Sequence, residues 1–279
     1  MPDAHLRHPE ERSGGTRLEG SAAVLRLPPV IGHRGAAARA PENTLAGLRR
    51  AKALGCSWVE FDVRLTGDGV PVLCHDPRLD RTTDGRGLVS GRTFAAVRDC
   101  DAGVGFDREF AGERVPTLEE ALALAGELDL GANIEIKAER GRDYATAAAV
   151  AATVRRLGDN APPVLVSSFQ PLAVAAIRTL APHLLRGILF RLVPRGWTET
   201  ARRLGCAAIG ADHRRLWRGR VAAIRAAGYP LMAYTVNDPA RARLLYAWGV
   251  TSVFSDVPDI ILRVNLGQSP ALMRQGAMV

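Results

Sequence analysis

The chain has 279 residues, of which 47% are hydrophobic and 24% charged, and this balance predicts one large globular domain with a substantial core. The formal charge of +8 arises from 37 Lys and Arg against 29 Asp and Glu residues, with no long basic run. Aromatic residues make up only 5%, too few for base-stacking platforms, which argues against a nucleic-acid partner. We interpret the charge as an arginine-rich surface; attraction to phosphate esters or other anionic partners is the alternative.

Polar residues from Met1 to about Pro28 predict a flexible N-terminal extension, and residues 267–279 a flexible tail, so the predicted domain spans residues 29–266. The N-terminal segment lacks the apolar core of a signal peptide, and no segment is long and apolar enough to span a membrane. These features predict a cytoplasmic protein without stable membrane insertion. Four scattered cysteines without a Cys-x-x-Cys pair argue against a zinc cage. The sequence indicates no oligomeric state.

Short apolar runs alternate with helical patterns from residue 30 onwards. In chain order, strands are predicted at residues 30–32, 58–65, 132–136, 164–167, 186–190, 206–210, 231–235 and 252–255. Helices are predicted at residues 44–54, from 117, at 143–157, 172–180, 198–204, 219–227 and 239–248, with a short last helix from residue 256. Thr117 followed by Glu120 forms the capping-box pattern of a helix start.

One segment departs from this alternation. Residues 66–69 predict a turn that leads into an extra hairpin strand at residues 70–73. A long irregular segment at about residues 76–115 then precedes the next helix, and segments of this length are usually functional or disordered. We therefore predict a small insertion after the second strand.

Alternating strands and helices imply a parallel sheet with covered faces. Eight such steps within about 240 residues predict a (β/α)₈ TIM barrel rather than an open doubly wound sheet. No Gly-x-Gly-x-x-Gly follows the first strand, which argues against a dinucleotide-binding fold. Active sites of such barrels lie at the carboxyl ends of the strands, and the unusual polar residues of this chain fall there.

Three carboxylates stand in strands that are otherwise apolar. Glu60 and Asp62 share one face of a strand, about 6.6 Å apart along it, and Glu135 offers a third carboxylate on another strand. Buried carboxylates repel one another unless a cation lies between them, and three oxygen ligands without cysteine favour Mg²⁺ or Ca²⁺. The alternative is a set of structural ion pairs with nearby Arg and Lys residues.

Two histidines accompany these carboxylates: His33 closes the first strand, and His75 follows the hairpin. One imidazole can accept a proton while the other donates one, although a lone strand-end histidine is more often structural. Arg34 and Lys137 offer positive charge for a phosphate. Together these groups predict phosphoryl chemistry. Glu42, just past the first strand, could orient His33, contact the metal shell or only cap a helix.

The chain resembles the glycerophosphodiester phosphodiesterase family through an ordered set of motifs across about residues 30–262. They are His33-Arg34-Gly35, Pro41-Glu42-Asn43-Thr44, Glu60-Phe61-Asp62-Val63, His75-Asp76, Pro116-Thr117-Leu118-Glu119-Glu120, Glu135-Ile136-Lys137, Ser167-Ser168-Phe169, Thr235-Val236-Asn237 and Ser255-Asp256-Val257-Pro258. The resemblance implies a TIM barrel with an insertion. It also implies cation-dependent hydrolysis of small glycerophosphodiesters to sn-glycerol 3-phosphate and an alcohol.

The resemblance implies a role for each candidate residue. The divalent cation would be held by Glu60, Asp62 and Glu135, with Glu42 close to it. The general base and general acid would be His33 and His75, in either order, and the phosphate would be bound by Arg34 and Lys137. Tyr234 stands where family members often have a tryptophan near the glycerol group, a difference that bears on substrate preference more than on the chemistry.

Two other functions fit the same scaffold. A lysophospholipase D-like phosphodiesterase would need an apolar groove or lid beside the site for an acyl chain. Candidates in the insertion, which could equally pack its own core, are Leu88, Val104, Phe106 and Phe110. A barrel that only binds phosphate esters is expected to have lost a critical side chain, and all are present here.

Overall fold

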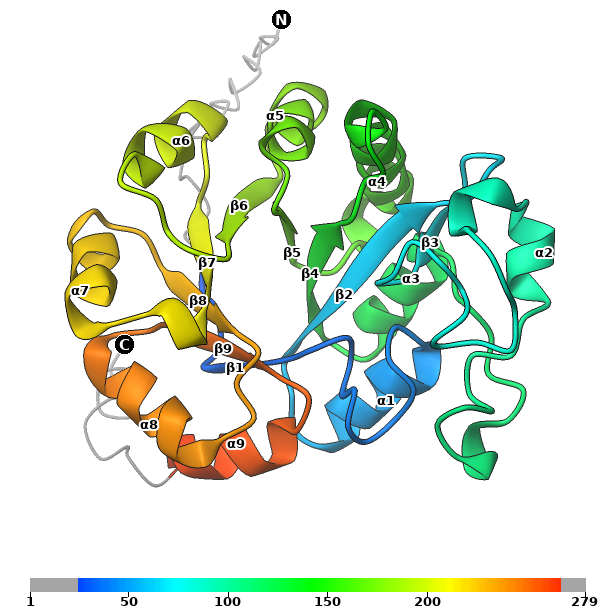
Figure 1. Ribbon diagram of the computed structural model, residues 1–279, viewed down its shortest axis with the longest axis horizontal. Coiled ribbons are helices and arrows are strands. Elements are labelled where there is room, and N and C mark those ends of the chain that lie inside the picture. Colours follow the sequence, from blue (N-terminus) through cyan, green and yellow to red (C-terminus); the bar gives the residue numbers. More distant parts are fainter. Residues whose placement is uncertain (1–24, 267–279) are drawn as a thin grey trace, which may run out of the picture.

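The computed structural model describes residues 25–266, so residues 1–24 of the predicted extension and the predicted tail lie outside the described part. Eight parallel strands form a closed ring with helices around it (Figure 1). They are β1 (Val30–Gly32), β2 (Trp58–Leu65), β4 (Gly131–Ile136), β5 (Val164–Ser168), β6 (Leu185–Phe190), β7 (Ala208–Asp212), β8 (Leu231–Tyr234) and β9 (Ser252–Ser255). The pairing of Gly32 with Val59 joins β1 to β2 and closes the ring. The predicted (β/α)₈ barrel is confirmed.

The connecting helices surround the ring. They are α1 (Leu45–Ala53), α3 (Leu118–Glu127), α4 (Asp143–Leu157), α5 (Pro171–Leu180), α6 (Trp197–Leu204), α7 (Arg218–Ala226), α8 (Pro239–Trp248) and α9 (Pro258–Leu266). The capping box at Thr117 and Glu120 is present as predicted. Thr44 caps α1 by accepting a hydrogen bond from the Gly47 backbone N–H.

The sixth strand of the ring, β7, begins two residues later than predicted. Gly205 ends α6 in the left-handed conformation, and the Cys206 N–H still donates to Ala201 O of that helix. Residues 206 and 207 therefore complete the turn, and β7 runs from Ala208 to Asp212. This shift places the Asp212 carboxylate at the carboxyl end of the strand, where the active site of a barrel lies.

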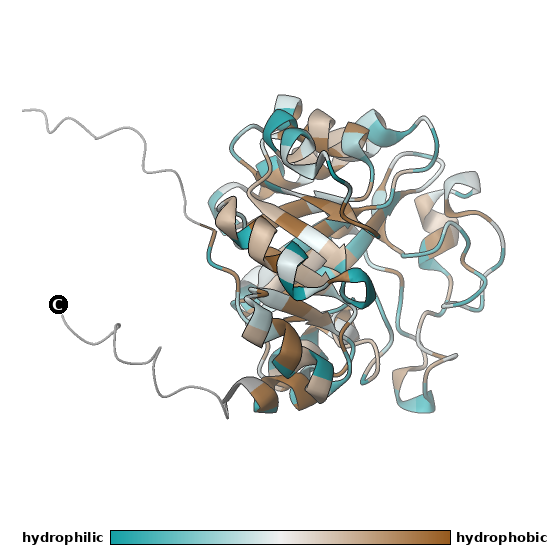
Figure 2. Cartoon of the chain, turned by 60° about the vertical axis from the view of Figure 1, so that its left-hand side comes forward, coloured by the Kyte–Doolittle hydropathy of each residue, from teal (hydrophilic) through white to brown (hydrophobic). Residues whose placement is uncertain are grey.

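The core has two layers, because alternate strand residues face opposite sides of the ring. Outward-facing residues of β2, such as Val59, Phe61 and Val63, pack against the helices in one buried cluster. A second cluster fills the inside of the ring with Ile31, Leu165, Leu189, Ala208, Met232 and Phe254. Figure 2 shows hydrophobic residues along the central strands and hydrophilic residues on the outer turns. The interior is thus a packed core with its polar residues at one end.

The insertion after β2 is a compact lobe beside the ring (Figure 1). Its first strand, β3 (Pro71–Leu73), pairs antiparallel with β2, as predicted for the hairpin. The segment predicted as irregular contains a short helix, α2 (Phe94–Arg98), and two single turns of 3₁₀ helix. Its own small core comprises Val72, Cys74, Leu79, Val89, Val97, Ala102 and Val115.

The large apolar residues of the insertion that the sequence singled out lie outside that core. Leu88 is 46% exposed, Val104 51% and Phe106 44%. Phe106 packs edge to face with Phe110 at a ring distance of 5.5 Å. Between residues 25 and 266, no helix has the length and apolar character needed to cross a bilayer.

Candidate active site

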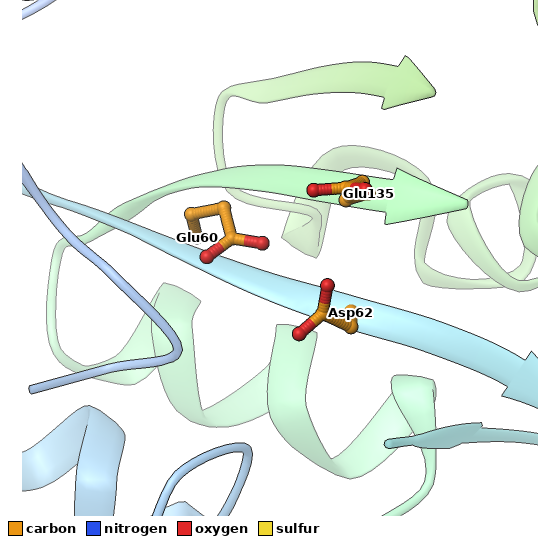
Figure 3. A group of neighbouring side chains, drawn as sticks. All are labelled: Glu60, Asp62 and Glu135. Atoms are coloured by element: carbon orange, nitrogen blue, oxygen red, sulfur yellow. The ribbon is translucent and has the colours of Figure 1, made fainter. Parts of the chain in front are cut away.

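The three predicted carboxylates meet at one place inside the ring (Figure 3). Asp62 of β2 pairs in register with Glu135 of β4, and Glu60 lies one pleat below Asp62 on the same face. One carboxylate oxygen of each residue lies within 4.8 Å of the others, and all three side chains are buried. The strand register therefore brings together an acidic group that could hold a metal ion.

The three carboxylates of this acidic group differ in how their negative charge is balanced by nearby cations. Asp62 lies 3.2 Å from Arg34 Nε and 3.4 Å from Lys137 Nζ, and it accepts a hydrogen bond of 3.0 Å from Asn43 Nδ2. Burial raises the pKa of Asp62, but Lys137 and Arg34 outweigh burial and hold this pKa below its usual range. Asp62 is therefore ionised without any added cation.

At Glu60 and Glu135 the nearby cations do not outweigh the effect of burial. Burial, followed by the charges of Asp62 and Glu135, raises the pKa of Glu60 well above its usual range. Glu60 Oε1 is buried without a hydrogen-bond partner among the described residues. Burial also raises the pKa of Glu135 to about 7, although Lys137 Nζ lies 2.5 Å from its Oε1. These oxygens fit a hard divalent cation, which would supply the positive charge that they lack.

Glu42 lies outside this acidic group. Its Oε1 accepts hydrogen bonds from Arg34 Nη1 at 2.9 Å and Arg81 Nη2 at 2.8 Å, and its Oε2 accepts one from Arg81 Nη1 at 2.8 Å. These bonds outweigh burial and lower the pKa of Glu42. Glu42 thus joins the insertion to the loop after β1, and neither orients His33 nor caps α1.

Each of the two histidines pairs with its own aspartate. His33 Nδ1 lies 2.6 Å from Asp256 Oδ1, and His75 Nδ1 lies 2.6 Å from Asp76 Oδ1. A hydrogen bond to Arg81 is the main cause that lowers the pKa of Asp76 to about 2. An ionised carboxylate can only accept, so Nδ1 of each ring carries the proton in the neutral form. Nε2 is then free to exchange protons, and that of His33 lies 3.8 Å from Glu60 Oε2.

Two residues of the loop after β1 adopt the left-handed backbone conformation that glycine normally takes. They are Arg34, with φ of 49°, and Asn43, with φ of 58°. Arg34 thereby donates its backbone N–H to Glu60 Oε2 at 3.0 Å. Asn43 Oδ1 accepts the Asp62 N–H at 2.9 Å while its amide donates to the same residue's carboxylate. Strained residues that hold the carboxylates mark this loop as part of the site.

Arg64 binds the backbone of both Lys137 and His75. The Arg64 guanidinium donates to His75 O at 2.9 and 2.7 Å and to Lys137 O at 3.0 Å. Lys137 Nζ also lies 5.3 Å from the centre of the Phe169 ring. Burial lowers the pKa of Lys137, but Glu135 and Asp62 raise it beyond its usual value, so the ammonium group is charged.

The polar groups line a cleft with two adjoining lobes. The first lobe, of about 480 Å³, extends over β2, β4 and β5, and includes Arg64, Asp76 and Gln170. The second lobe, of about 420 Å³, extends over β6 to β9 and includes His33, Arg34, Asp212, Arg215 and Tyr234. Both lobes are lined by His75, Glu135, Lys137, Phe169 and Arg191. Both histidines and Glu135 of the acidic group therefore line one solvent-accessible cleft.

Tyr234 takes part in the second lobe through its ring. The ring packs edge to face against Phe169 at 5.5 Å, and the hydroxyl donates to Phe190 O at 2.7 Å. Burial is the main cause that raises the pKa of Tyr234 above its usual value, so the hydroxyl stays protonated. This bond ties β8 to the end of β6.

The sequence model of the glycerophosphoryl diester phosphodiesterase family matches residues 33–260, which is most of the chain. The chain belongs to this family. The matched span contains both histidines and all four predicted acidic residues. The prediction that the chain is a phosphodiesterase of this family is therefore confirmed.

Individual members of the family cover nearly the whole described fold. Glycerophosphodiester phosphodiesterases of Caldanaerobacter subterraneus and Bacillus subtilis are each 32% identical to this chain. The matches cover 84% and 85% of this chain and 96% and 86% of those proteins. A solved structure of a phosphodiesterase from Oleispira antarctica, in complex with the product sn-glycerol-3-phosphate, is 39% identical with a TM-score of 0.84. The match covers 86% of this chain and 97% of the Oleispira antarctica chain.

Several site residues of this family member had no role in the sequence interpretation. Asp256 follows β9 as His33 follows β1, and neighbouring parallel strands bring such ends together, so this partner was open to prediction. Asp76 adjoins His75 in the chain and offered a similar signal. Arg81 and Glu42 are 39 residues apart with no pattern to link them. Asp212 was missed because β7 was placed too early.

Proposed function

We propose that the chain hydrolyses glycerophosphodiesters to sn-glycerol 3-phosphate and an alcohol, with a divalent cation at Glu60, Asp62 and Glu135. The observation that carries the proposal is that two His–Asp pairs lie beside a buried group of carboxylates, with both histidines and Glu135 lining one cleft. The Oleispira antarctica phosphodiesterase, which holds sn-glycerol-3-phosphate as product, supports this substrate class.

In this proposal the histidines move the protons. One Nε2 takes a proton from the attacking hydroxyl, and the other gives a proton to the oxygen of the departing alcohol. Burial lowers the pKa of His75, which favours its neutral form at neutral pH. The two roles stay unassigned. The proton balance is the same whether water attacks the phosphorus or the neighbouring glycerol hydroxyl does so and leaves a cyclic phosphate for water to open.

The remaining residues bind and orient the substrate. A bound cation would stabilise negative charge that develops on the phosphate oxygens. Lys137 and Arg34 would bind the non-bridging oxygens, because both are charged and line the second lobe. Tyr234 would offer its ring to the substrate, since its hydroxyl already donates to a backbone carbonyl.

Product release tests the proposal directly. We expect EDTA-treated protein to release no sn-glycerol 3-phosphate from glycerophosphocholine or glycerophosphoethanolamine, and Mg²⁺ or Ca²⁺ to restore the release. Restoration by one ion and not the other would identify the cation. Undiminished release after EDTA treatment and gel filtration would contradict a cation at Glu60, Asp62 and Glu135.

Cation binding should release protons, because Glu60 and Glu135 have raised pKa values in the absence of the ion. A carboxyl with a pKa of about 7 is half protonated at pH 7, so we expect Glu135 to contribute about half a proton per cation. The affinity for the cation should weaken as the pH falls below 7. Calorimetric titration at pH 7 in two buffers of unequal ionisation enthalpy measures the release.

The control for this titration is the same experiment at about pH 9. There Glu135 is already ionised, and its share of the released protons should vanish. An equal heat of binding in both buffers at pH 7 would show that no proton is released, and hence that Glu60 and Glu135 are already ionised before the cation binds.

A lysophospholipase D-like activity is the second candidate, and the insertion supplies the observation that favours it. Phe106 lines a cavity of about 130 Å³ together with Glu42 and Arg81, next to the proposed site. The exposed Val104 and Phe106 could contact an acyl chain there. Faster turnover of lysophosphatidylcholine than of glycerophosphocholine would favour this candidate.

Absence of nucleic-acid binding and a cytoplasmic location stay predictions.

A further inference from the structure

Charged residues are distributed unevenly around the rim of the cleft. The loops that follow β6 and β7, residues 191–196 and 213–217, contain four arginines and no carboxylate. The insertion on the other side, residues 76–115, contains seven arginines and eight carboxylates. Counting Asp212 at the end of β7, which also lines the second lobe, this side of the rim has a net charge of +3 and raises the local concentration of anions.

Two arginines of this basic rim reach the cleft itself. Arg191 lines both lobes and has no carboxylate partner within 4.0 Å in residues 25–266. It directly follows Phe190, whose carbonyl accepts the hydrogen bond from Tyr234, so the end of β6 is fixed. Arg215 lines the second lobe, and its Nε lies 4.0 Å from Asp212, a distance too long for a hydrogen bond.

These two guanidinium groups differ from the cations already placed at the phosphate. Arg34 contacts Glu42 and Asp62, and Lys137 contacts Glu135 and Asp62, so both are neutralised within the protein. Within residues 25–266, the guanidinium groups of Arg191 and Arg215 donate no hydrogen bond to a protein acceptor. A phosphodiester brings one negative charge for the cation and its neighbours, and a glycerol group brings only hydroxyls. A further anion that pairs with Arg191 and Arg215 must therefore come from the other alcohol.

We propose that the alcohol of the preferred substrate carries its own anionic group, foremost a second phosphate ester, and that Arg191 and Arg215 bind it over β6 and β7. Guanidinium groups suit this task because they bind phosphate oxygens with two parallel hydrogen bonds. The positively charged headgroups of choline and ethanolamine esters would be disfavoured by the same rim. The inference rests on the proposed hydrolysis and adds the substrate class to it.

Two substrates that differ in one group test the inference: glycerophosphoglycerol and glycerophosphoglycerol bearing a phosphate on its second glycerol. We expect kcat/KM to be about 10-fold or more higher for the phosphorylated substrate, mainly through KM. Arg191→Gln and Arg215→Gln should each lower kcat/KM for that substrate by about 10- to 100-fold and leave glycerophosphoglycerol within about two-fold. The matched control is Arg195→Gln, on the same loop as Arg191 but outside both lobes, which should change neither.

Three outcomes would overturn the inference. Equal turnover of the two substrates would remove the preference. Equal losses on both substrates in Arg191→Gln would assign this residue to the scissile phosphate. The exposed Leu192 and Trp217 flank these arginines in sequence, so we also measure co-sedimentation with anionic phosphatidylglycerol vesicles. Vesicle binding that Arg191→Gln abolishes, with unchanged kinetics, would assign the rim to a lipid surface. Release of no sn-glycerol 3-phosphate from either substrate contradicts the proposed hydrolysis instead.

Discussion

We expect His33→Ala and His75→Ala each to lower kcat by about 10²- to 10⁴-fold, because each removes one proton-transfer group. The fold and the cation affinity should be retained, since neither ring lies in a hydrophobic cluster or in the acidic group. Release of sn-glycerol 3-phosphate measures the loss, and circular dichroism and calorimetric titration of the cation check the rest. Near-native activity in both variants would exclude the proposed acid–base chemistry.

The aspartate partners provide the matched variants. Asp256→Asn and Asp76→Asn keep the size of the side chain but remove the charge that favours the Nδ1 proton of each ring. We expect smaller losses of kcat than in the alanine variants, and in Asp76→Asn a lower pKa of His75 visible in the pH–rate profile. A loss of activity without any shift of that profile would indicate only a structural role.

Glu60→Gln and Asp62→Asn should change stability in opposite directions although both weaken cation binding. The folded-state pKa of Glu60 is raised, so this carboxyl lowers stability progressively as the pH rises from its ordinary value of 4.5, where the unfolded chain ionises, to the raised pKa of the folded state. Glutamine removes that cost, and each kcal/mol gained raises Tm by about 2–4 °C in a domain of this size. Asp62→Asn instead removes the buried carboxylate that contacts both Arg34 and Lys137 and leaves them only Glu42 and Glu135 as partners, which should cost about 3–5 kcal/mol.

Thermal melting of the cation-free variants distinguishes these two results. The wild type should gain stability when Mg²⁺ or Ca²⁺ is added, whereas both variants should gain little, because binding to the folded state alone raises Tm. A lower Tm for cation-free Glu60→Gln would show that the wild-type carboxyl is stabilising. A full cation response in both variants would place the ion elsewhere.

The barrel could be predicted from sequence because each of its elements leaves a local signal. β2 and β4 are apolar runs of strand length, and Thr117 with Glu120 marks a helix start. The acidic group could be predicted because a period of two places Glu60 and Asp62 on one face and parallel register brings Glu135 beside them. These features depend on neighbouring residues or neighbouring strands.

Other features depend on loop geometry that leaves no such pattern. The left-handed conformation of Arg34 cannot be read from its residue type, which usually avoids it, and asparagine tolerates that conformation without requiring it at Asn43. The contact of Glu42 with Arg81 requires the insertion to fold back over the loop after β1. The family resemblance implied Glu42 close to the metal, and in the structure its carboxylate accepts hydrogen bonds from Arg34 and Arg81.

The hairpin strand β3 gives the protein two regions of unequal stability. It pairs with β2 outside the ring and carries His75 and Asp76 at its end, so one of the two proton-transfer groups depends on a peripheral element. Local unfolding of this hairpin would need less free energy than opening the ring. The enzyme can then lose activity on heating while its barrel and its acidic group are still intact. We therefore expect the inactivation temperature of this protein to lie below its melting temperature.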